Sequence, residues 1–170
     1  MNDPALSPHE PLQVLYVEDN PQDADLTAHS LRKLAGQIQL TTVASQKQAL
    51  ELLYEQRQPY QVVLIDRNLG DGDGLSLLVK IRSLSLPVAV VMITGSGDEE
   101  TVIAALKAGA DDYIIKRDDY LQRLPGVIES AWQHHRQQVS RYNRPLRVLY
   151  VEHQPADIDL TRRYLEKHVP

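Results

Sequence analysis

Residues 61–74 read Gln-Val-Val-Leu-Ile-Asp-Arg-Asn-Leu-Gly-Asp-Gly-Asp-Gly, and this stretch decides the fold. Its four consecutive apolar residues, Val62 to Ile65, indicate a strand buried on both faces, as in parallel α/β sheets. The run ends at a single carboxylate, Asp66, and a glycine-rich turn follows it. Ligands of open α/β sheets bind at the carboxyl ends of the strands. Taken alone, Asp66 also fits a turn former or a helix cap, so its role depends on the residues that the fold brings near it.

The composition narrows the class of protein. The length of 170 residues allows one ordinary domain and a short additional segment. A hydrophobic content of 42% with only 5% aromatic residues predicts an aliphatic core. The formal charge of −5 argues against a surface that coats nucleic acid. The sequence has no Cys, which excludes a disulfide framework and a thiolate metal site.

The sequence carries no targeting or membrane signal. Residues 1–10 are polar and contain two prolines, so we expect a flexible leader rather than a signal peptide. No apolar run approaches the ~20 residues that a membrane span needs. We therefore expect a soluble, cytoplasmic protein without membrane contact.

Strands and helices are expected to alternate along the chain, with strands as short apolar runs and helices opened by capping residues. The expected strands are residues 12–17, 38–43, 62–65, 88–93 and 113–115. The expected helices are one from Pro21 to about Gly36, one capped by Ser45, one at 74–84, one from Asp98 to Gly109, and a long last helix opened by Pro125. This alternation predicts a doubly wound parallel α/β sheet with the strand order 2-1-3-4-5.

The apolar positions of the helices predict which side chains face the core. For the first helix the expected inward residues include Ala24, Leu26, Leu31 and Leu34. For the fourth and last helices they include Ile103, Leu106 and Val139.

An internal repeat affects the expected domain organisation. Residues 145–167 repeat residues 11–33 at a constant offset of 134, with 14 of 23 positions identical. We expect a complete domain at 11–142, then at 143–170 a linker and the first strand and helix of a second, truncated copy, with the natural protein continuing beyond Pro170. In the second copy His153 replaces Asp19. The strand expected at 146–151 has no sheet of its own, so we expect it to pack on a sheet edge or on another molecule, for example in a homodimer.

Polar residues follow four of the expected strands at their carboxyl ends. They are Glu18, Asp19, Asp66, Thr94 and Lys116. Each has an ordinary explanation by itself, as a solvated turn, a cap or a surface cation. Their joint placement at neighbouring strand ends instead predicts one shared pocket at the switch point of the sheet.

The chemistry of this set indicates phosphoryl transfer. Three carboxylates a few Å apart repel by roughly 4 kcal/mol per pair at an effective dielectric near 20, and a divalent cation relieves that repulsion. Oxygen ligands favour Mg²⁺, which also binds phosphate oxygens. Asp66 can then act as the nucleophile, with Lys116 and the Thr94 hydroxyl stabilising the phosphoryl oxygens.

Residues 11–142 resemble the receiver domain of bacterial two-component response regulators. The motifs that carry the resemblance are Glu18-Asp19, Asp66 at the end of an apolar strand, Asp73-Gly74, Thr94-Gly95, and Lys116 after Tyr113. The resemblance implies a flavodoxin-like fold, and phosphate transfer from the phosphohistidine of a sensor histidine kinase or phosphotransfer protein to Asp66. It implies Mg²⁺ bound by Glu18, Asp19, Asp66 and the backbone carbonyl of Asn68.

The resemblance also implies a conformational switch made by Thr94 and Tyr113, which would remodel the face formed by the fourth helix, the fifth strand and the fifth helix. Three residues depart from the family pattern. Glu18 stands where the acidic pair usually has Asp, which is a common variant that should still serve the metal. Arg117 replaces the proline that usually follows the lysine, and Arg67 places a cation directly after the acceptor.

The sequence leaves three functions open. The first is a phosphorylatable receiver that acts through a downstream domain or partner protein, makes no nucleic-acid contact itself, and is no enzyme beyond its own phosphorylation and dephosphorylation. The second is a binding-only pseudo-receiver that docks partner proteins. The third is another class on the same fold: a haloacid-dehalogenase-like phosphatase would need Asp where Asn68 stands, and a flavin-binding domain would need hydroxyls where Glu18 to Pro21 stand.

Overall fold

The computed structural model describes residues 11–55, 60–95, 99–142, 158–159 and 161–164. The predicted leader at 1–10 and the predicted orphan strand at 146–151 lie outside the described residues. Residues 158–159 and 161–164 are helical.

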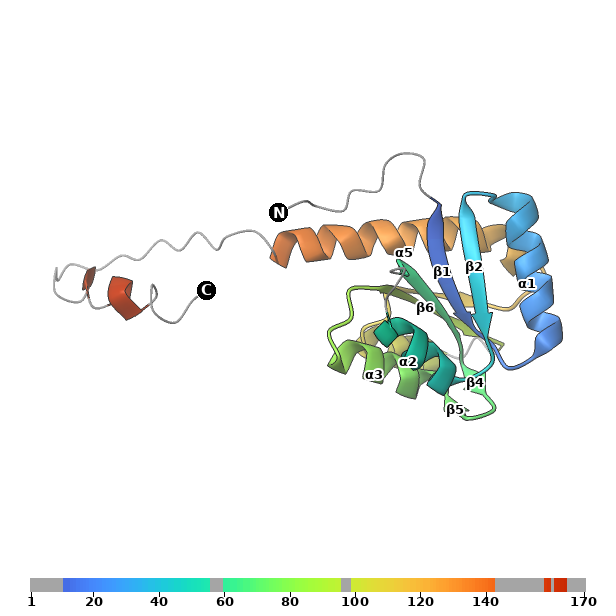
Figure 1. Ribbon diagram of the computed structural model, residues 1–170, viewed down its shortest axis with the longest axis horizontal. Helices are drawn as coiled ribbons and strands as arrows, with labels where there is room; N and C mark the ends of the chain where they lie inside the picture. Colours follow the sequence, from blue (N-terminus) through green and yellow to red (C-terminus); the bar gives the residue numbers. More distant parts are fainter. Residues whose placement is uncertain (1–10, 56–59, 96–98, 143–157, 160, 165–170) are drawn as a thin grey trace.

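A parallel five-stranded sheet forms the centre of the domain (Figure 1). Its strands are β1 (Leu12–Val17), β2 (Ile38–Val43), β3 (Val62–Asp66), β6 (Ala89–Thr94) and β7 (Asp112–Ile115). The order β2-β1-β3-β6-β7 is the predicted 2-1-3-4-5 order, since β6 and β7 are the fourth and fifth strands of this sheet. A small antiparallel hairpin, β4 (Asn68–Leu69) with β5 (Gly72–Asp73), follows β3 and was not predicted.

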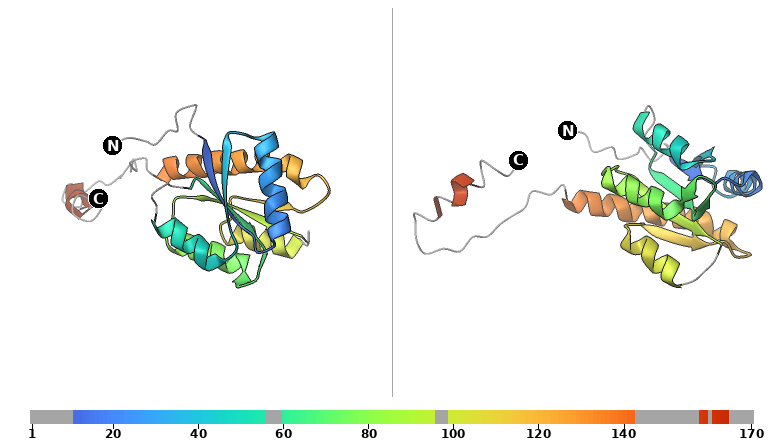
Figure 2. Two further views of the ribbon diagram at one scale, coloured as in Figure 1. Left: turned by 45° about the vertical axis from the view of Figure 1, so that its right-hand side comes forward. Right: turned by 90° about the horizontal axis from the view of Figure 1, so that it is seen from below.

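Helices cover both faces of the sheet (Figure 2). One core cluster joins the sheet to α1 (Pro21–Leu34) and α5 (Tyr120–Tyr142). The other joins it to α2 (Gln46–Glu55), α3 (Gly74–Ser83) and α4 (Glu99–Lys107). Alternate residues of one strand enter different clusters: Tyr16 belongs to the first and Leu15 to the second. This follows from the two-residue period of a strand, and explains why central strands read as continuous apolar runs.

Side chains fix where the helices begin. The Asn20 side chain accepts a hydrogen bond from the Gln22 N–H (3.0 Å), with Pro21 as the first helical residue of α1. The Ser45 hydroxyl accepts one from the Gln48 N–H (3.2 Å), which confirms its predicted role as the cap of α2.

The prediction that Pro125 opens the last helix is wrong, because α5 begins at Tyr120 and contains Pro125. The first turn is held by backbone bonds from Tyr120 N–H to the Arg117 carbonyl (2.9 Å) and from Gln122 N–H to the Asp119 carbonyl (3.0 Å). Tyr120 and Leu124 lie one turn apart and are both buried. Burial of these two side chains explains the earlier start.

Several predicted inward positions are exposed. Leu26 and Leu34 are each 51% exposed, because α1 buries Ala24, Thr27 and Leu31, whose spacing of three and four residues selects a different stripe. The same correction applies at the other helices to Ile103, Leu106 and Val139.

A polar brace ties the elements together at the amino ends of β6 and β7. Arg82 of α3 donates to the carbonyls of Gly109 (2.8 Å) and Val88 (2.9 Å) and pairs with Asp111 (2.7 Å). The other oxygen of Asp111 lies 3.1 Å from Nδ1 of His135, on α5. Beyond this brace the end of α5 projects past the rest of the domain (Figures 1 and 2). None of the described helices combines the length and apolar character needed to cross a bilayer.

Candidate functional site

The strand register brings the predicted site residues to one edge of the sheet. Val17 pairs with Ile65, so Glu18 follows β1 beside Asp66, the last residue of β3. Thr94 ends β6 and pairs with Ile115, the residue before Lys116. All these positions are carboxyl ends of parallel strands, as the sequence predicts.

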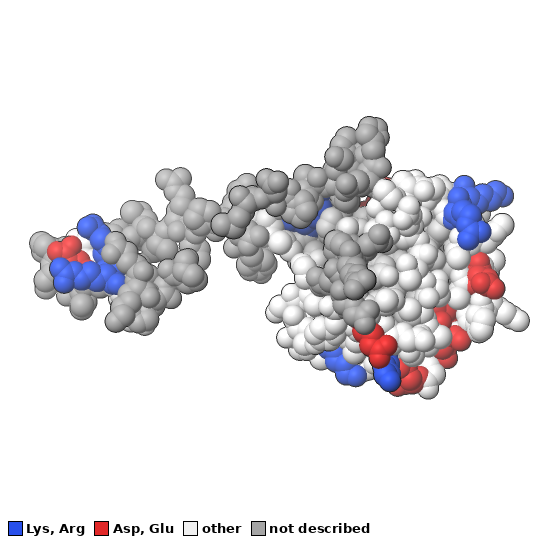
Figure 3. All heavy atoms as spheres, in the orientation of Figure 1, with Lys and Arg blue, Asp and Glu red and all other residues white. Residues whose placement is uncertain are grey.

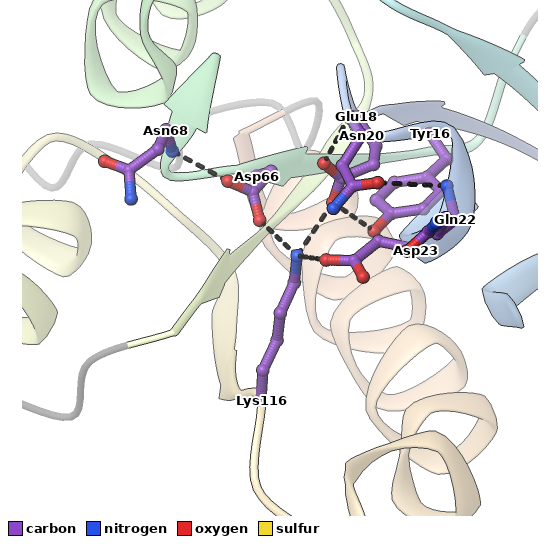
Figure 4. A network of polar contacts seen from close by, with 8 residues as sticks. All are labelled: Tyr16, Glu18, Asn20, Gln22, Asp23, Asp66, Asn68 and Lys116. Carbon is purple, nitrogen blue, oxygen red and sulfur yellow. Dashed lines mark hydrogen bonds and ion pairs between the residues drawn. The ribbon is translucent and has the colours of Figure 1, made fainter.

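The Lys116 ammonium lies at the centre of the site (Figure 4). Its Nζ is 2.7 Å from Oδ1 of Asp66, 2.8 Å from Oε2 of Glu18 and 2.7 Å from Oδ2 of Asp23. These groups come from β3, the end of β1, and the first turn of α1, and the lysine follows β7. Four elements thus meet at one cation.

Asp66 is nearly inaccessible, with 6% of its surface exposed. Its second oxygen accepts a hydrogen bond from the Asn68 backbone N–H (2.7 Å). Desolvation by burial raises the pKa of Asp66, against the lowering effects of Lys116 and of this N–H. The carboxylate is therefore held in place by two donors while it is poorly solvated.

Glu18 is turned into the protein and is 3% exposed. Besides Lys116, it accepts hydrogen bonds from the Tyr16 hydroxyl (2.8 Å) and the Asn20 backbone N–H (3.0 Å). Burial, followed by the negative charge of Glu18, raises the pKa of Tyr16, so this phenol stays a donor. Three donors thus fix the Glu18 carboxylate.

Asp19, the second member of the acidic pair, faces outward. It is exposed, and a Cβ added to Gly70 would lie 3.0 Å from its Oδ2, so the side chain reaches the loop after Asp66. The absence of a side chain at Gly70 leaves room for this approach. Among the described residues, no three acidic, His or Cys side chains form a ready-made metal cluster.

The Mg²⁺ ligands implied by the resemblance can be tested against this donor set. Glu18, Asp19 and Asp66 border the same edge and offer only oxygen atoms, which is the chemistry that Mg²⁺ prefers. The residues therefore fit such an ion.

Thr94 and Tyr113, the predicted switch residues, line one small cavity. Thr94 is 3% exposed and Tyr113 is half-buried. Arg67 also lines this cavity and forms an ion pair with Asp73. The peptide bond between Lys116 and Arg117 is trans.

Hydrogen bonds fasten the acceptor loop to α2. Asp71 accepts from the backbone N–H of Gln46 (3.1 Å), and the Gln46 side chain donates to the Asp73 carbonyl (3.3 Å). At the end of the loop, a Cβ on Gly74 would lie 2.1 Å from the Asp66 carbonyl oxygen. Only glycine allows this approach of α3 to the end of β3.

Two residues of the site were missed by sequence reasoning, Tyr16 and Asp23. Tyr16 lies two residues before Glu18 and so shares its side of β1, and Asp23 lies in the first turn of α1, three residues after the capping Asn20. The repeat offered a signal, because it retains both residues at the matching positions as Tyr150 and Asp157.

A parallel sheet in this order, with a polar site at the switch point between β1 and β3, defines a flavodoxin-like domain. Comparison with known proteins gives the family. The family described as "Response regulator receiver domain" matches residues 14–124, and the chain belongs to it.

Curated relatives extend well beyond the matched domain. The chain is 32% identical over 126 residues to the transcriptional regulatory protein ZraR of Escherichia coli, covering 74% of this chain and 27% of ZraR. It is 37% identical over 121 residues to the response regulator protein PilR of Pseudomonas aeruginosa, covering 70% and 26%. The chain thus spans about a quarter of the length of these relatives.

Solved structures agree with the fold. The phosphorylated cyanobacterial phytochrome response regulator RcpA is 26% identical, with a TM-score of 0.61, covering 72% of this chain and 94% of that one. NtrX from Brucella abortus, solved in complex with ADP, is 27% identical with a TM-score of 0.71, covering 94% and 34%. A CheY-like receiver domain from Methanospirillum hungatei, at 24% identity and a TM-score of 0.63, supports the fold alone and covers 75% and 99%.

Proposed function

We propose that residues 11–142 act as a phosphoacceptor switch in two-component signalling, with Asp66 receiving phosphate from the phosphohistidine of a sensor histidine kinase or phosphotransfer protein. The observation that carries the proposal is the buried Asp66 carboxylate with the Lys116 ammonium 2.7 Å from its Oδ1. In a receiver-family chain, this pairing places an acceptor oxygen beside a cation suited to phosphoryl oxygens.

The transfer uses the groups in place. An Asp66 oxygen forms a bond to phosphorus while the phosphorus–nitrogen bond of the phosphohistidine breaks, and the imidazole nitrogen keeps that electron pair. Lys116 neutralises charge on the phosphoryl oxygens, and the Asn68 backbone N–H orients the carboxylate (2.7 Å). These are positioning and charge effects, which phosphoryl transfer chiefly requires.

Magnesium is the cofactor that this donor set favours. Glu18, Asp19, Asp66 and the backbone carbonyl of Asn68 would hold it. When bound, the ion would supply positive charge that offsets the carboxylates and the incoming phosphate. Lys116 offsets two of these carboxylates without the ion.

The signal would leave through the α4–β7–α5 face. Thr94 and Tyr113 line a common cavity. The Thr94 hydroxyl would move toward the phosphoryl group and the Tyr113 ring would turn inward behind it, which shifts an existing equilibrium between two packings.

The proposed organisation extends beyond residues 11–142. Residues 143–170 would be a linker and the start of a second receiver-like unit, the output would lie in a downstream domain or partner, and the protein would work in the cytoplasm and catalyse only its own phosphorylation and dephosphorylation. Direct nucleic-acid contact by this domain is not expected. On the face shown in Figure 3, the described Lys and Arg side chains lie in separate groups rather than in one basic surface.

Acetyl phosphate with Mg²⁺ tests the function directly. A single acyl phosphate adds about 80 Da to the intact mass. We expect this adduct on the wild-type chain and none on Asp66→Asn, which keeps the shape of the side chain without a nucleophilic carboxylate. An unmodified wild-type mass would overturn phosphorylation.

A magnesium titration distinguishes the phosphoacceptor function from the alternative function, a binding-only pseudo-receiver. A phosphorylatable site should bind Mg²⁺, and Asp19→Asn should weaken that binding. A domain that only docks partners would show neither the ion nor the adduct. The acidic edge around Asp66 favours the first function.

A further inference from the structure

The Lys116 ammonium has no donor to spare. An ammonium group has three N–H donors, and three carboxylates lie within 2.8 Å of Nζ, from Asp66, Glu18 and Asp23. The first two belong to the predicted site. Asp23 comes from α1, and the proposed phosphoryl transfer gives it no role.

A phosphoryl oxygen can pair with Lys116 only if one of these contacts is given up. Asp66 is the acceptor, and an acyl phosphate formed at its Oδ2 leaves Oδ1 as a carbonyl oxygen that still accepts from Lys116. Glu18 is 3% exposed and is also bound by the Tyr16 hydroxyl and the Asn20 N–H. The Asp23 side chain is 36% exposed, and Lys116 is the one hydrogen-bond partner found for it within the described residues. Release of Asp23 to solvent is therefore the least costly exchange.

We propose that Asp23 is a positioning residue that holds the Lys116 ammonium on the α1 side in the unphosphorylated domain, and that it is the carboxylate displaced when Lys116 pairs with the phosphoryl group. This inference rests on the proposed phosphoacceptor function. Asp23 then lowers the affinity of the site for a phosphoryl group, because its ion pair with Lys116 must break first. The same ion pair connects α1 to the phosphorylation state of Asp66.

The internal repeat also supports a role for Asp23 that does not depend on the metal. Tyr150, Glu152 and Asp157 stand where Tyr16, Glu18 and Asp23 stand, whereas His153 replaces Asp19. Two of the three acids that contact the lysine in the first copy, Glu18 and Asp23, thus have counterparts in a segment that lacks one proposed metal ligand. Asp23 is the one of these two that is not a proposed metal ligand, and its retention as Asp157 fits a role separate from metal binding.

Beryllium fluoride, which mimics a phosphoryl group on a carboxylate, provides the test on residues 1–170 at saturating Mg²⁺. We expect Asp23→Asn to bind beryllium fluoride about fivefold more tightly than wild type, the scale of one partly exposed ion pair. Asp23→Glu, which keeps the charge, should move the affinity back toward wild type.

Asp25→Asn is the matched control. Asp25 lies on the same helix, is exposed, and loses the same charge on substitution. Equal effects of Asp23→Asn and Asp25→Asn on the affinity would mean that the loss of any negative charge on α1 explains the result, and this would overturn the inference. Unchanged affinity in Asp23→Asn would overturn it as well, whereas a wild-type chain that binds no beryllium fluoride would overturn the phosphoacceptor function and this inference with it.

A double-mutant cycle on unfolding examines the contact without any phosphoryl mimic. Asp23→Asn and Lys116→Gln should each change the free energy of unfolding, and their combined effect should differ from the sum, because the two groups are 2.7 Å apart. Strict additivity would show that Asp23 does not hold Lys116 in solution.

Discussion

Asp66 shows how one residue can combine a functional position with a cost to stability. Burial disfavours its charged form, and the Lys116 ammonium and the Asn68 N–H only partly compensate, so its pKa lies above the ordinary value. The folded domain therefore binds this proton more tightly than the unfolded chain does. The ionised carboxylate needed for nucleophilic attack is maintained at the expense of folding.

A prediction follows for Asp66→Asn in the presence of a chelator. The variant should be more stable than wild type at pH 7, by an amount on the order of 1 kcal/mol. Because the folded-state pKa is raised, the charge penalty in wild type is present at neutral pH and is lost as pH falls toward about 4, the unfolded value. Urea unfolding of both proteins at several pH values measures this difference.

The direction of the pH effect is the decisive result. A stability difference that shrinks as pH falls agrees with the raised pKa of Asp66. An Asp66→Asn variant that is less stable than wild type at pH 7, with the deficit vanishing as pH falls, would mean that Lys116 outweighs burial and lowers this pKa.

At the scale of elements, α3 starts against the end of β3 through the glycine at position 74. A Cβ there would lie 2.1 Å from the Asp66 carbonyl oxygen and 2.9 Å from a methyl carbon of Ile65. The backbone of the acceptor strand cannot yield easily, since β3 is hydrogen-bonded on both sides to β1 and β6. This contact sets how closely the loop carrying Asn68 packs beneath the site.

We expect Gly74→Ala to destabilise the domain by roughly 3 kcal/mol or more, the scale of overpacking in a buried position. Gly126→Ala is the matched control, because this glycine is exposed within α5 and no atom lies within 4 Å of an added Cβ. That substitution should stabilise by about 0.5–1 kcal/mol through helix propensity. Thermal unfolding of the two variants compares them, and similar melting temperatures would contradict the close packing at Gly74.

The elements also show what local sequence can and cannot predict. Each strand of the five-stranded sheet was predictable, because such a strand is a short, mainly apolar run between turn residues, whereas the two-residue strands of the β4–β5 hairpin carry no such signal. The start of α5 was not, because the signal of Pro125 was outweighed by burial of Tyr120 and Leu124 in the core. The inward face of α1 was also predicted incorrectly, because packing in the folded domain buries Thr27 and leaves the more apolar Leu26 exposed.

For the molecule as a whole, the order of the strands was predictable from the sequence. Which side chains meet in the site was predictable only in part. Glu18, Asp66, Thr94 and Lys116 each adjoin an apolar strand, so the register alone places them at one edge. The contact of Asp23 with Lys116 depends on where α1 crosses that edge, which no local pattern encodes. The same holds for the pairing of Asp111 with Arg82 and His135, which joins parts of the chain distant in sequence.

Assembly is the prediction at this scale. The apolar segment at 146–151 is expected from sequence to be a strand without a sheet, so residues 1–170 should associate more than residues 1–143 do. Light scattering at matched concentrations measures the two masses. In the chain of residues 1–170, Leu149→Asp should lower the number of associated copies by placing a charge in the segment, and the same number of copies for all three proteins would remove this segment as the cause of assembly.

The brace on Asp111 has a mechanical consequence for α5. Asp111 contacts α5 through the side chain of His135. The 23 residues of α5 form a rod about 35 Å long, at 1.5 Å per residue. The rod is packed in the core from Tyr120 to Trp132 and tied to Asp111 at His135, so the segment that can swing is the part beyond His135. That part is about 10 Å long, and a tilt of roughly 5° would move its end by ~1 Å. The sideways reach of this end is therefore set by the length of helix beyond the brace.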